Sequence, residues 1–431
     1  MRTLWLWSFV FLLCPRADER MSMAQEANYD EAKIPPYELP DLLLTTGGEQ
    51  VTTAEQWLKV RRPELLRLFE EQMFGRAPSR PVDLHWQITD EDQAALAGRA
   101  IRKQVTIYFS KDRSGPRMDL LLWLPKSVSG PVPVFLGLNF VGNHGTHPDP
   151  AIRLTESWMR DDDKAGVVNN LATEQSRGRD QSSWPVAEIL ARGYGLGTIY
   201  YGDIDPDFDD QFQNGVHQLY HGSGRGGPTP EQWGSIATWA WGLSRALDYL
   251  QTEAAVDAKR VAVVGHSRLG KTAMWAGAID ERFALVISNN SGCGGAALSR
   301  RRIGETVQRI NTVFPHWFCD NFTQYNGRED ELPFDQHGLV ALVAPRPILI
   351  TSAEEDRWAD PRGEFLSAFH ASPVYELLGQ PGIAGPDMPP MHQLSGGRIG
   401  YFIRAGEHAM TKMDWEAYLE FADRNLVRST Q

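Results

Sequence analysis

The pattern of hydrophobic and polar positions changes along the chain and predicts two kinds of strand. Residues 82–124 hold three segments in which apolar and polar residues alternate, VDLHWQI, RKQVTIYF and RMDLLLWL, as in antiparallel strands with one face in solvent. Later segments are continuous apolar runs, as expected where a parallel sheet is covered on both faces. These runs span 132–140, 193–201, 261–265, 283–288 and 347–352. The chain should therefore form a sheet that is antiparallel near its beginning and parallel afterwards.

Segments long enough for helices separate the continuous runs. The clearest is TPEQWGSIATWAWGLSRALDYLQTE, residues 229–253, where Thr229 and Gln232 resemble a capping box at the helix start. Antiparallel strands followed by alternating strands and helices are typical of the α/β-hydrolase fold, a mostly parallel central sheet with helices on both faces. No repeat, low-complexity linker or long charge block divides the chain. We therefore predict one α/β-hydrolase domain over residues 25–431.

Two connections, at about 141–186 and 292–338, are longer than a compact domain normally carries, and both are rich in aromatic, Gly, Asn and charged residues. Each follows the C-terminal end of a predicted strand, the edge at which open α/β sheets bind ligands. The interpretation we favour is that they form the walls of a substrate cleft. The alternative is that they are surface insertions without a role in binding.

The first residues, MRTLWLWSFVFLLC, have the features of an export signal: one arginine, then an apolar run too short to cross a bilayer. Ser22 and Ala24 are small residues that predict cleavage after Ala24, and Leu13 before Cys14 is a poor match to a lipid-anchor site. We expect residues 1–24 to be a signal peptide, and the mature protein to be secreted or periplasmic.

The net charge limits the classes of partner. It is −12 for all 431 residues, and residues 1–24 carry three arginines against two acidic residues, so their removal leaves −13. A protein of this charge repels nucleic acid and anionic membranes. Only Cys293 and Cys319 lie beyond residue 24, which excludes a disulfide framework or a four-thiolate metal site. The sequence leaves open whether these two cysteines pair.

The stretch VAVVGHSRLGKTAMWAG, residues 261–277, predicts a nucleophile. A buried strand, a tight turn and an amphipathic helix follow one another, with Ser267 at the turn. In a nucleophile elbow, small flanking residues let strand and helix approach while the serine hydroxyl stays exposed. Gly265 lies two residues before the serine, but Gly270 lies three after it, which departs from the usual G-x-S-x-G spacing. A turn with a purely structural role is the alternative.

Two cations accompany the serine. The helix N-terminus aims unpaired N–H groups at the position of an oxyanion, and Arg268 can add its backbone N–H and its guanidinium. Lys271 lies four residues after Ser267, on the same helix face. It is either a functional cation or a solvated surface lysine.

The catalytic base and acid should follow the serine in the order acid, then histidine. Residues 398–404 read as a strand and a helix begins near Met413, which places His408 where the base is expected; His392, in a Pro- and Met-rich loop, is its competitor. The loop after the run at 347–352 offers the acid, and we favour Asp356, four residues past Ser352. The other carboxylates in that loop are Glu354, Glu355 and Asp360.

Several motifs resemble the bacterial glucuronoyl esterases of carbohydrate esterase family 15. They are GHSRLGK, SGCGGAALSRR, PHWFCDNF, DRWADP and GEH, and the resemblance runs from about residue 36 to the C-terminus. It accounts for the late second glycine. It implies an α/β-hydrolase that cleaves the ester between (4-O-methyl-)glucuronic acid of xylan and lignin alcohols, without a metal or organic cofactor.

The resemblance also implies roles for individual residues. Ser267 matches the nucleophile, His408 the base and Arg268 the oxyanion-stabilising arginine, while Lys271 matches a lysine that holds uronate hydroxyls. Glu305 and Trp358 match an acid and a tryptophan that line the sugar site.

One position departs from the family. Many members have a glutamate as the triad acid twenty-three residues past the serine, and this chain has Asn290 there. An amide cannot stabilise an imidazolium by charge. Some bacterial relatives resemble this chain in having a carboxylate after the later strand, where Asp356 lies, so both arguments favour Asp356. The alternatives are a weakened enzyme or an altered residue.

These features predict serine acyl transfer. A xylan acetyl esterase is the nearest alternative and would need only a small acyl pocket without the lysine. A non-catalytic carbohydrate-binding relative is the alternative from another class. We expect a protein that acts as a monomer on glucuronoxylan and lignin–carbohydrate esters.

Overall fold

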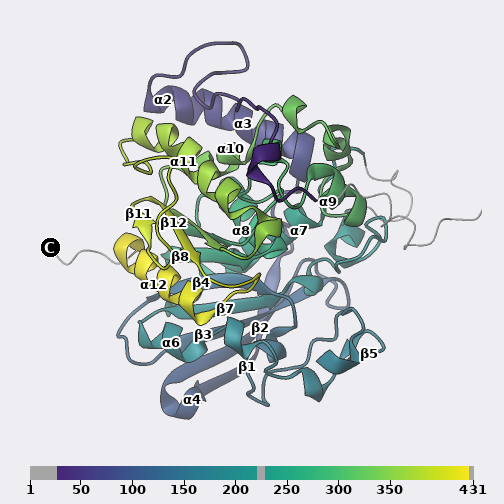
Figure 1. Ribbon diagram of the computed structural model, residues 1–431. Helices are drawn as coiled ribbons and strands as arrows, with labels where there is room; N and C mark the ends of the chain where they lie inside the picture. Colours follow the sequence, from purple (N-terminus) through teal and green to yellow (C-terminus); the bar gives the residue numbers. More distant parts are fainter. Residues whose placement is uncertain (1–26, 221–228, 427–431) are drawn as a thin grey trace, which may run out of the picture.

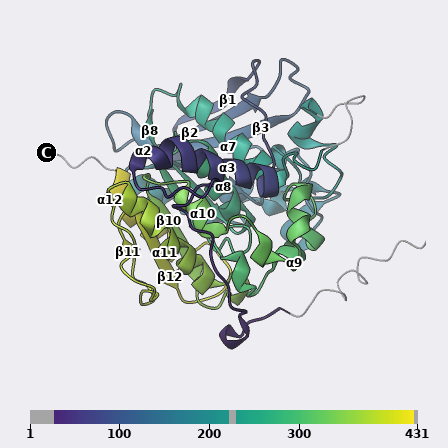
Figure 2. The ribbon, with the colours of Figure 1, turned by 90° about the horizontal axis from the view of Figure 1, so that it is seen from above.

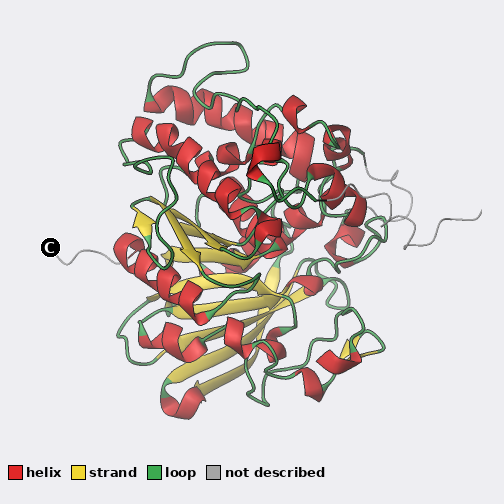
Figure 3. Ribbon diagram, in the orientation of Figure 1, coloured by secondary structure: helices red, strands yellow, loops and turns green. Residues whose placement is uncertain are grey.

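The computed structural model describes residues 27–220 and 229–426, so the predicted signal peptide lies outside the described residues. A ten-stranded sheet has the order β1-β2-β3-β7-β4-β8-β9-β10-β12-β11, and Figure 3 shows it crossing the molecule between helices. Its strands are β1 (His85–Ala94), β2 (Ala100–Tyr108), β3 (Arg117–Pro125), β4 (Val132–Asn139), β7 (Gly195–Tyr200), β8 (Val256–His266), β9 (Leu285–Asn289), β10 (Ile348–Ala353), β11 (Ser395–Gly396) and β12 (Ile399–Arg404). A separate pair is formed by β5 (Val167–Val168) and β6 (Leu171–Ala172).

Strand direction confirms the predicted fold class. β1, β2, β3 and β7 pair antiparallel, whereas β7, β4, β8, β9, β10 and β12 run parallel. The short edge strand β11, which no run of the sequence predicts, pairs antiparallel with β12. All parallel strands therefore end at one edge, where Ser267 follows β8.

Helices cover both faces of the sheet. Figure 1 shows α6 and α12 beside each other at the lower left, apart from α3, α10 and α11 at the top. The helices are α2 (Ala54–Gln56), α3 (Arg62–Phe69), α4 (Ala95–Gly98), α5 (Asn143–Thr146), α6 (Val186–Ala191), α7 (Ser235–Leu250), α8 (Arg268–Ile279), α9 (Val307–Val313), α10 (Gln336–Ala341), α11 (Pro361–Leu377) and α12 (Lys412–Leu426). Both long connections hold short elements: α5 and the β5–β6 pair lie in the first, and α9 and the beginning of α10 lie in the second.

Each parallel strand contributes to two cores because successive side chains point to opposite faces. In β8, Val263 packs into the larger core with α7, α8 and α11, whereas Val264 packs into the smaller core with α6 and α12. In β9, Val286 and Ile287 divide in the same way. Burial on both faces explains why these strands read as continuous apolar runs.

The N-terminal helices close the larger core. Seen from above, α2 and α3 lie over α8 and α10 (Figure 2). The rings of Phe69 and Trp275 lie 6.5 Å apart, and the Arg62 guanidinium donates to the Ala278 carbonyl at the end of α8, 2.9 Å away. These contacts hold the nucleophile helix from its outer side.

The predicted helix start at Thr229 is wrong. α7 begins at Ser235 with Gly234 as its N-cap and no side-chain cap, while the Thr229 carbonyl accepts the Gln232 N–H in a turn. The first N–H groups of α7, those of Ser235 and Ile236, instead donate to the carbonyls of His316 and Trp317 at 2.8 and 3.1 Å. A distant segment caps the helix, so the local capping pattern does not mark its start.

Candidate active site

Ser267 lies in a sharp turn between β8 and α8, as the sequence predicts. Its φ and ψ are 56° and −129°, a strained conformation for a residue other than glycine. A Cβ on Gly265 would lie 1.9 Å from the Leu269 carbonyl oxygen. A Cβ on Gly270 would lie 3.1 Å from the carbonyl oxygens of Asn289 and Gly265. The late glycine therefore serves the close approach of helix and strand.

His408 and Asp356 come together at this turn. The Nδ1 of His408 donates to Oδ2 of Asp356 at 2.6 Å, which leaves Nε2 free to take a proton from the serine. The His408 ring also lies 4.5 Å, centroid to centroid, from that of His266, the residue before the serine. The structure thus brings the predicted base and acid together and places them beside Ser267, the predicted nucleophile.

Asp356 is held as an anion. Burial, the largest influence, would raise its pKa, but the hydrogen bond and charge of His408 and the hydrogen bond from Asn290 together lower it. The Nδ2 of Asn290 donates to Oδ2 of Asp356 at 2.7 Å. Asn290, at the position where many family members are expected to have the acid, therefore stabilises the charged form of Asp356.

The competing residues lie elsewhere. Glu354 and Glu355 are exposed. Asp360 is bound by Arg301 at 2.7 Å and caps α11 through the Gly363 N–H. His392 is exposed and contacts Met413.

His266, which sequence reasoning missed, packs against the ring of His408, the predicted base. Its Nδ1 lies 2.6 Å from Oδ1 of Asn289. Burial, followed by the positive charge of His408, lowers its pKa to about 3. Its position next to the serine is the signal that could have identified it.

Two neighbouring side chains hold the guanidinium of Arg268 in place. Asp207 binds its Nη1, and its Cζ lies 4.7 Å from the centre of the Trp317 ring. Burial would raise the pKa of Asp207, but a hydrogen bond from His316 and the charge of Arg268 hold it well below its usual range. Sequence analysis missed Asp207, although the acidic run DIDPD at the end of β7 lies at the ligand-binding edge of the sheet.

Lys271 is not a surface lysine, because only 4% of it is exposed. Its Nζ donates to the Ser291 carbonyl at 2.5 Å and lies 3.8 Å from Oε2 of Glu305. Burial raises the pKa of Glu305, although the charge of Lys271 opposes this. Lys271 and Glu305, predicted separately from the sequence, therefore form a buried pair.

Trp358 lies on the same side of the molecule. The Glu305 N–H donates to the Trp358 carbonyl at 3.1 Å. Trp358 is 36% exposed, and the Arg309 guanidinium lies 5.7 Å from the centre of its indole ring. An accessible aromatic ring thus adjoins the Lys271–Glu305 pair.

The two cysteines of the described residues do not form a disulfide. Cys293 and Cys319 are both free and buried. Burial raises the pKa of the Cys319 thiol to about 12, so it stays protonated.

Among residues 27–220 and 229–426, no group of three or more His, Cys, Asp or Glu is placed to hold a metal ion. Within the same residues, no helix combines the length and apolar character needed to cross a membrane.

Glu364 is a buried carboxyl beneath the loop that carries Asn290, and sequence analysis missed it. It accepts from the Gly292 N–H at 2.9 Å and from the hydroxyls of Ser352 and Ser291 at 2.5 and 3.3 Å. Burial raises its pKa to about 8. Glu364 lies in the first turn of α11, just after the loop that carries Asp356. The only sequence signal for it is a charged residue on an otherwise apolar face of the helix.

This raised pKa predicts a pH-dependent stability. Glu364 stays protonated in the folded protein and ionises near its ordinary pKa when unfolded, so its contribution is complete below about pH 4.5 and is lost as pH rises toward 8. At about 1.4 kcal/mol per pKa unit, the effect is several kcal/mol. In thermal unfolding from pH 5 to 8, the wild type should lose stability relative to Glu364→Gln. A constant difference between the two melting temperatures would contradict the expectation.

The chain is similar in sequence to known carbohydrate esterases. A family model described as "Glucuronyl esterase, fungi" matches residues 216–379, a span that includes Ser267 and Asp356. The carbohydrate esterase MZ0003, from an unknown prokaryotic organism, is 54% identical over 401 residues, which cover 93% of this chain and 92% of that protein. The 4-O-methyl-glucuronoyl methylesterase 1 of Wolfiporia cocos is 35% identical over 196 residues, 43% of this chain and 47% of its own.

The fold is shared as well. The solved structure of a glucuronoyl esterase from Solibacter usitatus superposes with a TM-score of 0.88 and 48% identity, and the match covers 92% of this chain and 100% of that one.

Proposed function

Because this chain belongs to the glucuronoyl esterases of carbohydrate esterase family 15 and is a carboxylic ester hydrolase, we propose that it cleaves the ester between (4-O-methyl-)glucuronic acid of xylan and lignin alcohols through Ser267. The uronic acid is the acyl group and the lignin alcohol leaves. The export signal expected in residues 1–24 fits an enzyme that meets plant cell-wall polymers outside the cytoplasm, where we propose that it acts as a monomer.

The first half of the reaction forms an acyl-enzyme. His408 takes the Ser267 proton at Nε2, and the serine oxygen attacks the uronoyl carbonyl. Asp356 orients the imidazole and stabilises its protonated form. The N–H groups at the start of α8 and the guanidinium of Arg268, anchored by Asp207, stabilise the oxyanion. His408 then gives its proton to the departing alcohol oxygen as the carbon–oxygen bond breaks.

The second half releases the acid. His408 removes a proton from water, the hydroxide oxygen attacks the acyl-enzyme, and the proton returns to Ser267 as the bond to the serine breaks. The side chain of His408 is 41% exposed, so water and an alcohol both have access to it.

The observation that supports a uronate substrate best is the buried Lys271–Glu305 pair beside Ser267. A buried cation and carboxylate are costly unless they have partners, and the hydroxyls of a sugar ring offer both donors and acceptors. The esterified carboxyl is neutral, so Lys271 would bind hydroxyls of the substrate, or the carboxylate of the product. An acetyl esterase would need neither residue.

The test is hydrolysis of benzyl glucuronate by the wild type, with 4-nitrophenyl acetate run beside it. We expect a kcat/KM for the glucuronate ester well above that for the acetyl ester. Turnover of the acetyl ester alone would favour an acetyl esterase. No turnover of either ester, with no labelling by a fluorophosphonate, would favour a binding protein.

Replacing Lys271 should affect the two substrates differently. Lys271→Met keeps most of the volume but loses the charge, and a hydrogen bond to a charged group is worth about 1.5–3 kcal/mol. The kcat/KM for benzyl glucuronate should therefore fall about 10- to 150-fold, while that for 4-nitrophenyl acetate stays within about twofold. Equal losses on both esters would assign Lys271 a structural role instead.

A further inference from the structure

A second pocket, separate from the Ser267–His408–Asp356 site, opens near the start of β3. It has a volume of about 390 Å³. Three segments line it: the turn that leads into β3, with Arg117; the first long connection, with Glu156 and Trp158; and the loop after β7, with Pro206 and Gln218. No residue given a role in acyl transfer above is among its lining residues.

The pocket lies at the edge of the sheet where the nucleophile lies. β3 runs antiparallel to β7, so β3 starts where β7, β4 and β8 end. Neighbouring strands are about 4.8 Å apart, which puts the pocket on the order of 10–15 Å from the turn of Ser267 along this edge. Pro206, in the pocket wall, precedes Asp207, which binds Arg268. One loop therefore borders both sites.

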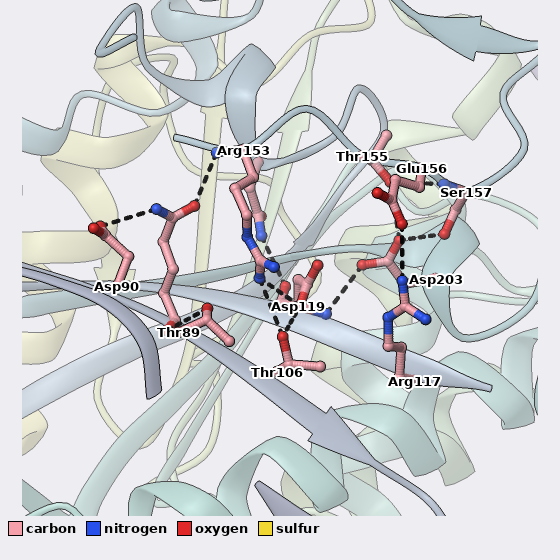
Figure 4. Close-up of polar contacts among 12 residues, drawn as sticks. Thr89, Asp90, Thr106, Arg117, Asp119, Arg153, Thr155, Glu156, Ser157 and Asp203 are labelled. Atoms are coloured by element: carbon pink, nitrogen blue, oxygen red, sulfur yellow. Dashed lines mark hydrogen bonds and ion pairs between the residues drawn. The ribbon is translucent and has the colours of Figure 1, made fainter. Parts of the chain in front are cut away.

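Hydrogen bonds among its own residues hold the wall of the pocket. The hydroxyls of Thr155 and Ser157 donate to Oδ1 of Asp203 at 3.1 and 2.7 Å, and the N–H of Asp119 donates to its other oxygen at 3.1 Å. Arg153 binds Asp119 at 2.9 Å. Figure 4 shows these side chains converging between β3 and the first long connection.

The lining suits a neutral sugar. Trp158 is half-buried, and its ring lies 4.5 Å from that of Phe208, so it is a supported aromatic surface of the kind on which sugar C–H groups pack. Arg117 and Glu156 form an ion pair at 2.9 Å and can offer donors and acceptors to hydroxyls.

Other ligand classes fit less well. Among the lining residues, the acidic Asp119 and Glu156 outnumber the cationic Arg117, which disfavours an anion such as a second uronate. Arg117 and Trp158 do not suit a metal ion. A lignin aromatic would need an apolar pocket, whereas most of this wall is polar.

We propose that this pocket binds neutral sugar units of the polysaccharide that carries the ester, as a second subsite beside the acyl-transfer site. The proposal rests on the function proposed above, because it assigns a place to the glycan on which the glucuronic acid is a branch. The subsite adds affinity for polymeric substrate through a linked second contact. It makes no contact with the reacting ester.

The kinetic test compares two glucuronate esters, one attached to a xylo-oligosaccharide and the other, benzyl glucuronate, without a glycan. Trp158→Ala and Arg117→Ala should raise the KM for a glucuronate ester carried on a xylo-oligosaccharide about tenfold, equal to 1.4 kcal/mol, and leave benzyl glucuronate unchanged. Lys111→Ala, which removes an exposed cation near the same turn, is the matched control and should change neither value. Unchanged KM for the oligosaccharide ester in both variants would overturn the proposal, as would equal losses on both carriers.

A binding test separates this proposal from the function. Titration calorimetry with an unesterified neutral xylo-oligosaccharide should give a heat of binding with the wild type that Arg117→Ala weakens about tenfold. Arg117 is partly exposed and paired only at the surface, so its variant should fold even if Trp158→Ala does not. Absence of binding to the wild type would overturn the subsite, whereas failure to hydrolyse benzyl glucuronate would overturn only the proposed function.

Discussion

Ser267→Ala should lower the turnover of benzyl glucuronate by about a millionfold, the loss typical of a serine hydrolase without its nucleophile. The variant cannot form the acyl-enzyme, and only the oxyanion donors and substrate binding remain. Alanine and serine tolerate the positive φ of this turn equally poorly, so the fold should not change. Release of glucuronic acid is the measurement, with thermal unfolding as the check on folding.

A fluorophosphonate probe supplies the control for this prediction. It should label the wild type and Ser110→Ala, in which a serine far from β8 in sequence is removed, but not Ser267→Ala. Labelling that persists in Ser267→Ala, or activity within a hundredfold of wild type, would place the nucleophile at another residue.

The sequence predicts the parallel half of the sheet and the nucleophile turn well because both depend on local requirements. A strand buried on both faces must be apolar throughout, and the turn at Ser267 needs small residues wherever helix and strand touch. The run at 261–265 accordingly falls within β8, and the run at 347–352 overlaps all but the last residue of β10. His408 and Asp356 follow from the chain order of the fold, and their hydrogen bond of 2.6 Å agrees with that argument.

Contacts between distant segments could not be predicted. α7 begins six residues after Thr229 because His316 and Trp317 accept its first N–H groups. The hydrogen bonds of Asp207 to the same two residues, which hold Arg268 in place, cross about 110 residues of chain. Nothing in the local pattern marks either partner, because each depends on where the second long connection folds back.

Asp356→Asn should lower kcat on benzyl glucuronate about 10⁴-fold, an effect known for the buried acid of serine proteases. Asparagine is nearly isosteric, so the loop should keep its shape. Its amide, however, cannot stabilise an imidazolium by charge, and it can turn an N–H toward Nδ1 of His408, which favours the wrong tautomer. The measurement is kcat and KM together, and KM should change little because Asp356 is buried behind the histidine and does not contact substrate.

Asn290→Ala is the matched control, since it removes a neighbour of Asp356 but keeps the carboxylate. The hydrogen bond of 2.7 Å from Asn290 helps to keep Asp356 ionised, and its loss should cost about 10- to 100-fold in kcat, as expected for a hydrogen bond to a charged group. The order of the two losses identifies the acid. If Asp356→Asn stays within tenfold of wild type while Asn290→Ala is the more damaging change, the acid function does not reside at Asp356. A double variant, Asp356→Ala with Asn290→Glu, tests whether the acid can stand at either loop position. If it turns over benzyl glucuronate faster than Asp356→Ala alone, a carboxylate at either position can serve as the acid. Asn290 would then be a hydrogen-bond partner of an acid that lies on the other loop, and not a sign of lost activity.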